Sequence, residues 1–175
     1  MEEIASHIMD LVTNSISAKA KNIEVSVIED RAAALLEVRV KDDGKGMDRE
    51  SAKRIQDPFF STKTGRKVGL GVPLLKGTAE TTDGAFSLTS ELGEGTEVTA
   101  SFRLTHPDLP VLGNLRDTVL VLIVGNPDVD FVFSYKKDDK TFLLDTKEVK
   151  KLLGDVPVNH PEVIRFLSKY LDENL

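Results

Sequence analysis

The stretch "KDDGKGM" (41–47) places two adjacent acids beside two glycines, at the end of a run, "ALLEVRV", that alternates like a strand. A carboxylate desolvated in a pocket is a strong, directional hydrogen-bond acceptor when its donor is present. Gly44 and Gly46 let the backbone turn and approach a ligand closely, because they lack a Cβ atom. The stretch fits a ligand-binding carboxylate at Asp42, and it also fits an ordinary acidic turn, which an Asp–Gly pair favours.

Two further groupings have spacings suited to chemistry. Asp10 and Asn14 are four residues apart in a helical pattern, which puts both on one helix face a single turn apart. Gly69 and Gly71 precede another predicted helix, whose first N–H groups and dipole favour an anion. The basic residues between Lys63 and Lys67 either offset the charge of such an anion or form a solvated charge cluster.

The elements that must position these residues follow from hydrophobic periodicity and turn signals. The apolar spacing predicts a helix over 2–18, and Asp48 suits the N-cap of a short helix. Beyond "THPDLP" (105–110), the apolar run "DTVLVLIVG" predicts a strand. The expected elements are helices over 2–18, 48–56, 70–82, 146–153 and 160–172, strands over 22–29, 34–41 and 117–125, a strand pair over 84–104, and a hairpin over 130–145. This order predicts an α+β protein, a two-layer α/β sandwich whose mixed sheet has helices on one face and a pocket between the helices and the loop over 57–69.

Composition excludes several classes of protein. The chain has 175 residues, 40% of them hydrophobic and 30% charged, which is typical of a folded domain. A net charge of −6 argues against a dedicated nucleic-acid binder. The absence of cysteine excludes disulfides and iron–sulfur ligation. No apolar run approaches the roughly 20 residues of a membrane span, so we expect a cytoplasmic protein with a domain over 1–106 and a C-terminal extension over 107–175.

Five motifs occur in a fixed order: "DLVTNSISA", "DDGKGM", "PFFSTK", "GLGV" and "GEGT". Together they resemble the ATP-binding Bergerat fold shared by gyrase B, heat-shock chaperone ATPases, histidine kinases and MutL, the GHKL superfamily. The resemblance covers roughly residues 1–104. The first motif is similar to MutL-type proteins, whereas "PFFSTK" and "GLG" are more similar to histidine kinases.

The resemblance implies a role for each motif residue in binding Mg·ATP. Asp42 corresponds to the carboxylate that accepts a hydrogen bond from the adenine amino group, and Thr96 to the hydroxyl that helps to hold it. Gly44, Gly46 and Met47 would shape the base pocket, and Asn14 would bind Mg²⁺ through its amide oxygen. Asp10 occupies the place of a general base that is Glu in gyrase-like and MutL-like members, and it is one methylene shorter. The alternative for Asp10 is a solvated helix residue.

Residues 57–71 would form a lid over the nucleotide, with Phe59 and Phe60 anchored on the apolar wall. The other ATP-binding residues implied by the resemblance are Thr62, Lys63, Gly69, Leu70, Gly71 and Val72. We expect Asp43, commonly Asn in the family, to point to solvent. We expect His7 to be an ordinary histidine on the helix surface, because the phosphoacceptor of a histidine kinase belongs to a separate dimerising helix.

The expected function is Mg-dependent ATP binding by a stand-alone, histidine-kinase-like ATPase domain that regulates a protein partner. As an enzyme, the protein would be a protein kinase similar to the anti-sigma-factor serine kinases, or a slow ATPase. The alternative is a non-catalytic binding module whose lid orders on nucleotide binding. The strand over 117–125 and the hairpin over 130–145 would extend the sheet or form the surface of a homodimer.

Overall fold

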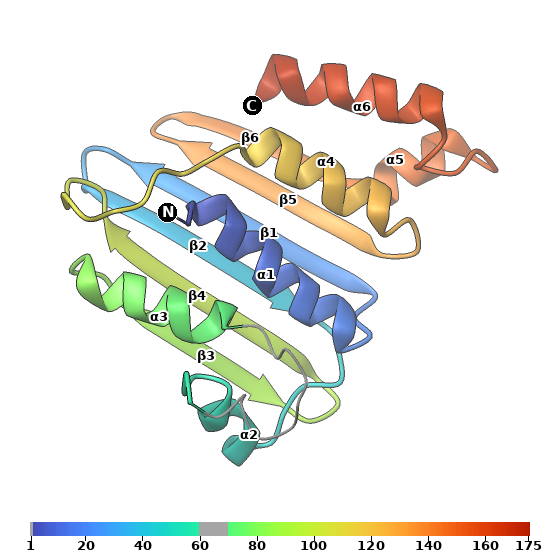
Figure 1. Ribbon diagram of the computed structural model, residues 1–175. Coiled ribbons are helices and arrows are strands. Elements are labelled where there is room, and N and C mark those ends of the chain that lie inside the picture. Colours follow the sequence, from blue (N-terminus) through green and yellow to red (C-terminus); the bar gives the residue numbers. More distant parts are fainter. Residues whose placement is uncertain (1, 60–69) are drawn as a thin grey trace.

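The computed structural model describes residues 2–59 and 70–175, and its centre is one mixed sheet of six strands in the order β3-β4-β2-β1-β5-β6 (Figure 1). Neighbouring strands are antiparallel except for β1 and β5, which are parallel. The strands are β1 (Asn22–Asp30), β2 (Leu35–Asp42), β3 (Phe86–Glu91), β4 (Gly95–Arg103), β5 (Asp130–Lys137) and β6 (Lys140–Asp145). All three predicted hairpins are confirmed.

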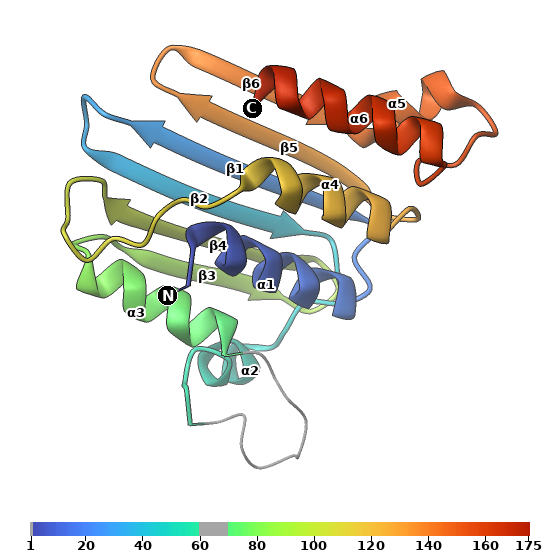
Figure 2. The same cartoon turned by 45° about the horizontal axis from the view of Figure 1, so that its top comes forward.

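The helices form the second layer. α1, α3, α4 and α6 lie on the same face of the sheet in both views (Figures 1 and 2), which confirms the predicted two-layer α+β architecture. The alternation of the strands explains this, because Ile23, Val25 and Val27 are buried under the helices while the intervening side chains face the open side. The helices are α1 (Ile4–Ser17), α2 (Arg49–Arg54), α3 (Gly71–Thr81), α4 (Leu115–Gly125), α5 (Thr146–Leu153) and α6 (Pro161–Asn174).

Local signals set several helix ends as the sequence predicted. The Asp48 carboxylate caps α2 by accepting a hydrogen bond from the Ser51 N–H at 2.7 Å. Pro73 lies in the first turn of α3, where its missing N–H has no intrahelical partner to lose. In the part of the chain that the structure describes, no helix is both long and apolar enough to cross a lipid bilayer.

The prediction of a strand over 117–125 is wrong, because these residues form most of α4. The Asn114 side chain caps the helix by accepting a hydrogen bond from the Asp117 N–H at 2.9 Å. Val119, Leu122 and Ile123 are buried at helical spacing, whereas Val121 is 58% exposed. A run of β-branched and leucine residues carries no periodicity of its own, so the cap and the tertiary packing decide its conformation.

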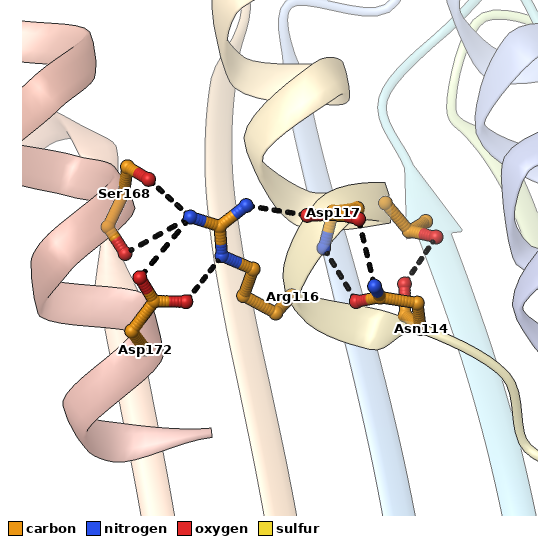
Figure 3. A network of polar contacts seen from close by, with 6 residues as sticks. Asn114, Arg116, Asp117, Ser168 and Asp172 are labelled. Atoms are coloured by element: carbon orange, nitrogen blue, oxygen red, sulfur yellow. Dashed lines mark hydrogen bonds and ion pairs between the residues drawn. The ribbon is translucent and has the colours of Figure 1, made fainter.

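The C-terminal part of the chain extends the same sheet. β5 runs beside β1, with Ile23 opposite Phe131, and the buried side chains of both parts belong to one hydrophobic core. Figure 3 shows how Arg116 of α4 holds α6: its guanidinium donates to Asp172 at 2.7 Å, and to Asp117 and Ser168. The apolar hairpin is therefore integrated into the fold, and a domain boundary at residue 106 stays a prediction.

Candidate functional site

A cavity of about 360 Å³ lies between the C-terminal half of α1, the start of α3 and the sheet. Most of its wall is apolar, with a few polar groups on one side, which is typical of a site for a small organic molecule. Its lining residues are Leu11, Asn14, Ser15, Ser17, Ala18, Val40, Asp42, Lys45, Gly46, Met47, Ile55, Val72, Leu88, Thr96 and Val98.

The carboxylate of Asp42 is the buried charged group of this wall. Asp42 ends β2 and is 9% exposed. One carboxylate oxygen accepts a hydrogen bond from Ser15 Oγ at 2.6 Å, and the other accepts from the Gly44 N–H at 2.8 Å. An ionised carboxylate has about four acceptor positions, so Asp42 retains capacity to accept from a ligand in the cavity.

The glycine turn after Asp42 packs directly on the neighbouring hairpin. Gly46 has a φ of +67°, and a Cβ at this position would lie 1.9 Å from the carbonyl oxygen of Glu91. The Gly93 N–H donates to the carbonyl of Lys45 at 2.8 Å, which fastens the turn to the β3–β4 connection. Gly46 therefore allows the backbone to turn, as the sequence predicted, and it allows a close approach to the β3–β4 hairpin, whereas close approach to a ligand stays a prediction.

Thr96 lies directly opposite Asp42 in the antiparallel pairing of β2 and β4. Its hydroxyl is 2.7 Å from that of Ser90, and Ser90 Oγ also accepts a hydrogen bond from the Met47 N–H at 2.8 Å. The hydroxyl groups of Thr96 in β4 and Ser90 in β3 thus connect these two strands to the backbone of Met47, which lines the cavity.

On α1, Asn14 lines the cavity and Asp10 lies one turn earlier. The Asp10 side chain packs against the first residue of α3: a Cβ at Gly71 would lie 2.7 Å from Asp10 Cβ and 3.1 Å from Oδ2. Burial, followed by the charge of Glu2, raises the pKa of Asp10, although the charge of His7 opposes this. Asn14 therefore lines the cavity, whereas Asp10 lies beside the N-terminus of α3, is exposed and does not line the cavity, as the alternative of a solvated helix residue predicted.

His7 does not lie on the helix surface as predicted. It is 1% exposed, and within the described ranges its Nδ1 atom has no hydrogen-bond partner. Its Nε2 atom lies 3.7 Å from Glu2 Oε2. Burial lowers the pKa of His7, while the nearby charges of Glu2 and Asp10 raise it. The apolar spacing of α1 defines only the centre of its buried face, and His7 extends that face toward Asp10.

Asp43 is exposed, as predicted, but its carboxylate is fully engaged. It accepts hydrogen bonds from the Lys21 N–H at 2.8 Å, the Asn22 N–H at 2.9 Å and the Asn22 side-chain amide at 2.7 Å. The turn after α1 is thereby tied to the end of β2.

Part of the predicted lid can be placed. Val72 is buried and lines the cavity, Gly71 begins α3, and Leu70 is 48% exposed at the N-cap. The side chain of Phe59 is 81% exposed, so it is not anchored on the apolar wall. The predicted site residues Phe60, Thr62, Lys63 and Gly69 lie outside the described residues.

Sequence reasoning missed two hydroxyl groups of the site, those of Ser15 and Ser90. Ser15 had a detectable signal, because it lies on the apolar face of α1 in register with Ile8 and Leu11, where a buried hydroxyl needs a partner. Ser90 had none, since alternating Ser and Thr residues are ordinary in a strand. The sequence also did not identify the apolar wall, which depends on how distant elements pack: Val40, Ile55, Leu88 and Val98.

Residues 2–106 match the family described as Histidine kinase-, DNA gyrase B-, and HSP90-like ATPase. Among curated proteins, Sporulation kinase C of Bacillus subtilis (strain 168) is 34% identical over 87 residues, which cover 50% of this chain and 20% of that protein. Sensor histidine kinase YxdK of the same strain is 32% identical over 99 residues, which cover 53% of this chain and 30% of that protein. The chain thus spans less than a third of the length of these relatives.

Two solved structures share the fold. The N-terminal domain of a DNA repair protein superposes with a TM-score of 0.59 at 16% identity, covering 89% of this chain and 58% of that one. The Aquifex aeolicus MutL ATPase domain complexed with ADP superposes with a TM-score of 0.50 at 18% identity, covering 97% of this chain and 88% of that one. Both superpositions cover more of this chain than residues 2–106, so the shared fold extends into its C-terminal part.

Proposed function

We propose that this chain, which belongs to the Histidine kinase-, DNA gyrase B-, and HSP90-like ATPase family, binds Mg·ATP in the cavity between α1, α3 and the sheet. The observation that carries the proposal is Asp42: a buried carboxylate with unused acceptor capacity beside an apolar cavity. The carboxylate can accept a hydrogen bond from the adenine amino group. Guanine presents a carbonyl at the same place, which cannot donate to Asp42, so guanine is rejected.

The adenine ring lies, in this proposal, between apolar side chains that exclude water from the hydrogen bond to Asp42. Met47 and Val98 supply two of these walls. Gly44 and Gly46 keep the turn close to the base, and Thr96, whose hydroxyl bonds to Ser90, lines the cavity opposite Asp42. Exclusion of water strengthens a charge-assisted hydrogen bond, which gives the site its base selectivity.

The phosphates extend toward Asn14 and the N-terminus of α3. The first N–H groups of an 11-residue helix and its dipole favour an anion there, at Leu70 and Gly71. The amide oxygen of Asn14 is a hard donor of the kind that Mg²⁺ prefers, and it would hold the ion beside the phosphates. When bound, Mg²⁺ neutralises charge on the phosphates. We assign Phe60, Thr62, Lys63 and Gly69 to the same nucleotide on their sequence motifs alone.

Asp10 is the proposed general base for the attacking hydroxyl or water. Its position beside Gly71 puts it next to the proposed phosphate site, and its raised pKa makes it a better proton acceptor than an ordinary aspartate. This supports an enzyme over an inert nucleotide scaffold.

Two downstream activities are consistent with this site. The names of two relatives, a sporulation kinase and a sensor histidine kinase, favour phosphoryl transfer to a protein partner over slow hydrolysis. The second candidate is a non-catalytic module that binds a partner, or a second copy of this chain, when nucleotide is bound. The shorter reach of Asp10, compared with Glu, favours this second candidate.

The decisive first experiment is thermal unfolding with and without Mg·ATP, because a ligand that binds only the folded state raises the midpoint. We expect a magnesium-dependent rise in the wild type and none in Asp42→Asn. Asp138→Asn is the matched control, because Asp138 lies in the β5–β6 turn at φ +51°, which Asn tolerates. No rise in the wild type at millimolar Mg·ATP, or an equal rise in Asp42→Asn, contradicts the proposed site.

Phosphate release and transfer of labelled phosphate then separate the activities. Release without a partner indicates an ATPase, label on an added protein indicates a kinase, and binding with neither supports the binding module.

A further inference from the structure

The three hydrogen bonds of Asp43 form a clasp between two segments that are far apart in sequence. Lys21 and Asn22, which donate them, follow the turn after α1, whereas Asp43 follows the last residue of β2. The Asp43 N–H also donates to the Asn22 carbonyl at 3.3 Å. A solvent-facing side chain with three short donors is restrained, and its orientation is set by the fold.

A second contact fastens the same loop to the end of α1. The Lys45 N–H donates to the carbonyl of Ala18 at 2.9 Å. Between the two contacts, Gly44 lies so close that a Cβ there would be 2.9 Å from both the Cβ and the carbonyl oxygen of Ala18. The loop that carries Asp42 is thus held on the C-terminal end of α1, the helix that carries Asn14 and Ser15.

The clasp also separates the roles of two adjacent carboxylates. Burial alone would raise the pKa of Asp43, but the hydrogen bonds from Asn22 and Lys21 together lower it, so this carboxylate is ionised at neutral pH. Its charge is balanced by three N–H donors. Within residues 2–59 and 70–175, Asp42 accepts from two donors and keeps capacity for a ligand.

We propose that Asp43 is a positioning residue for nucleotide binding: its clasp on Lys21 and Asn22 fixes the distance between the Asp42 carboxylate and Asn14 of α1. The inference rests on the proposed function. A nucleotide whose base binds Asp42 and whose phosphates bind near Asn14 needs both groups at one spacing. A ligand that contacts Asp42 alone does not.

This difference gives the test. Calorimetry measures the dissociation constants of Mg·ATP and of adenosine for the wild type, Asp43→Ala and Asp43→Asn. Asp43→Ala removes all three bonds, and we expect it to weaken Mg·ATP about tenfold while adenosine changes much less. Asp43→Asn keeps one oxygen for the two backbone donors, and the Asn22 amide can rotate so that its oxygen accepts from the new amide, so its effect is smaller and it serves if Asp43→Ala does not fold.

The reciprocal exchange N22D with D43N also keeps that last bond, because the new amide at 43 donates to the new carboxylate at 22. We expect it to bind Mg·ATP more tightly than Asp43→Ala does. Asp138→Ala is the control for lost stability alone: Asp138 accepts from the Arg31 N–H at 3.0 Å and Arg31 Nε at 2.7 Å, at the opposite end of β1. Asp138 has a φ of +51°, where alanine is strained, so we expect Asp138→Ala to lose at least as much stability as Asp43→Ala.

The outcomes are distinguishable. Wild type that binds neither ligand overturns the proposed function and the clasp's role with it. Wild type that binds Mg·ATP, with Asp43→Ala binding equally well or losing adenosine and Mg·ATP in equal proportion, overturns the positioning role and leaves the proposed function intact. A loss of Mg·ATP affinity in Asp138→Ala equal to that in Asp43→Ala reduces the clasp to a stability effect.

Discussion

The pocket side of α1 and the junction between α4 and α6 both gather polar side chains, and they differ in how far their hydrogen bonds are satisfied. At the junction, Arg116 donates to Asp172, Asp117 and Ser168, so each carboxylate has a charged partner (Figure 3). At the pocket, Asp42 accepts from Ser15 of α1 and from Gly44 among the residues that the structure describes, and it lines the cavity with capacity remaining.

The difference separates stabilising polar groups from binding groups. A polar cluster that is complete within the protein gains nothing from a ligand, so it stabilises the docking of one helix on another. A buried acceptor with unused positions has lost hydrogen bonds to water that the protein does not fully replace. A ligand that donates to it supplies the missing hydrogen bond. Charge alone does not distinguish the two, because both contain carboxylates: Asp42 in the pocket, and Asp117 and Asp172 at the junction.

The largest expected effect comes from removing the proposed base. Asp10→Asn keeps the shape beside Gly71 and removes the proton acceptor, so we expect turnover of ATP, by hydrolysis or transfer, to fall about 10³-fold. Affinity for Mg·ATP should change little, since Asp10 acts, in this proposal, on the attacking group and does not bind the adenine ring. Single-turnover kinetics with a separate binding measurement test this. A parallel loss of affinity would show that Asp10 binds the phosphates instead.

A pair of serine variants tests the comparison itself. Ser15→Ala removes the hydroxyl that donates to Asp42 at 2.6 Å, so we expect Mg·ATP to bind about tenfold more weakly. Ser168→Ala removes a hydroxyl that accepts from Arg116 at the junction, and it should leave affinity unchanged. Equal losses in the two variants would mean that the serines act through overall stability.

Arg116→Ala should show the reverse pattern. It leaves Asp172 without its partner and loosens α6, so we expect the unfolding midpoint to fall by about 3 °C. The effect is modest because Asp172 is 60% exposed and water replaces part of the interaction. Mg·ATP should raise the midpoint of the variant by as much as that of the wild type. A smaller rise would couple the junction to the pocket.

Much of the nucleotide-binding part was predictable because its signals are local. The glycine turn at 44–46, the Asp48 cap and the alternation of β1 and β2 each depend on neighbours in sequence. The order of the family motifs along the chain predicted which segments meet at the pocket. The family match and the solved structures confirm the fold.

The failures have one physical cause, which is packing between distant elements. The run over 117–125 is apolar at almost every position, so its helical conformation depends on the Asn114 cap and on the contacts with α1 and α6. Asp43 was expected to face solvent only, because its donors, Lys21 and Asn22, lie 22 and 21 residues earlier in the sequence. His7 is the exception, because it lies at helical spacing from Ile4 and Leu11 on the apolar face of α1, and only its polar side chain argued for the surface.

The smallest expected effect concerns His7. It distinguishes a histidine that is buried on α1 from one that is exposed. Because burial lowers the pKa of His7 below its ordinary value of about 6.5, the unfolded chain binds a proton more readily than the folded one. Stability is therefore complete above that value and decreases as the pH falls through it. We expect His7→Leu to flatten the dependence of the unfolding midpoint on pH between about 7 and 5. His160→Asn, at the exposed N-cap of α6, is the control for replacing a histidine, because Asn also caps a helix. An identical slope in His7→Leu and the wild type would mean that the charges of Glu2 and Asp10 offset burial.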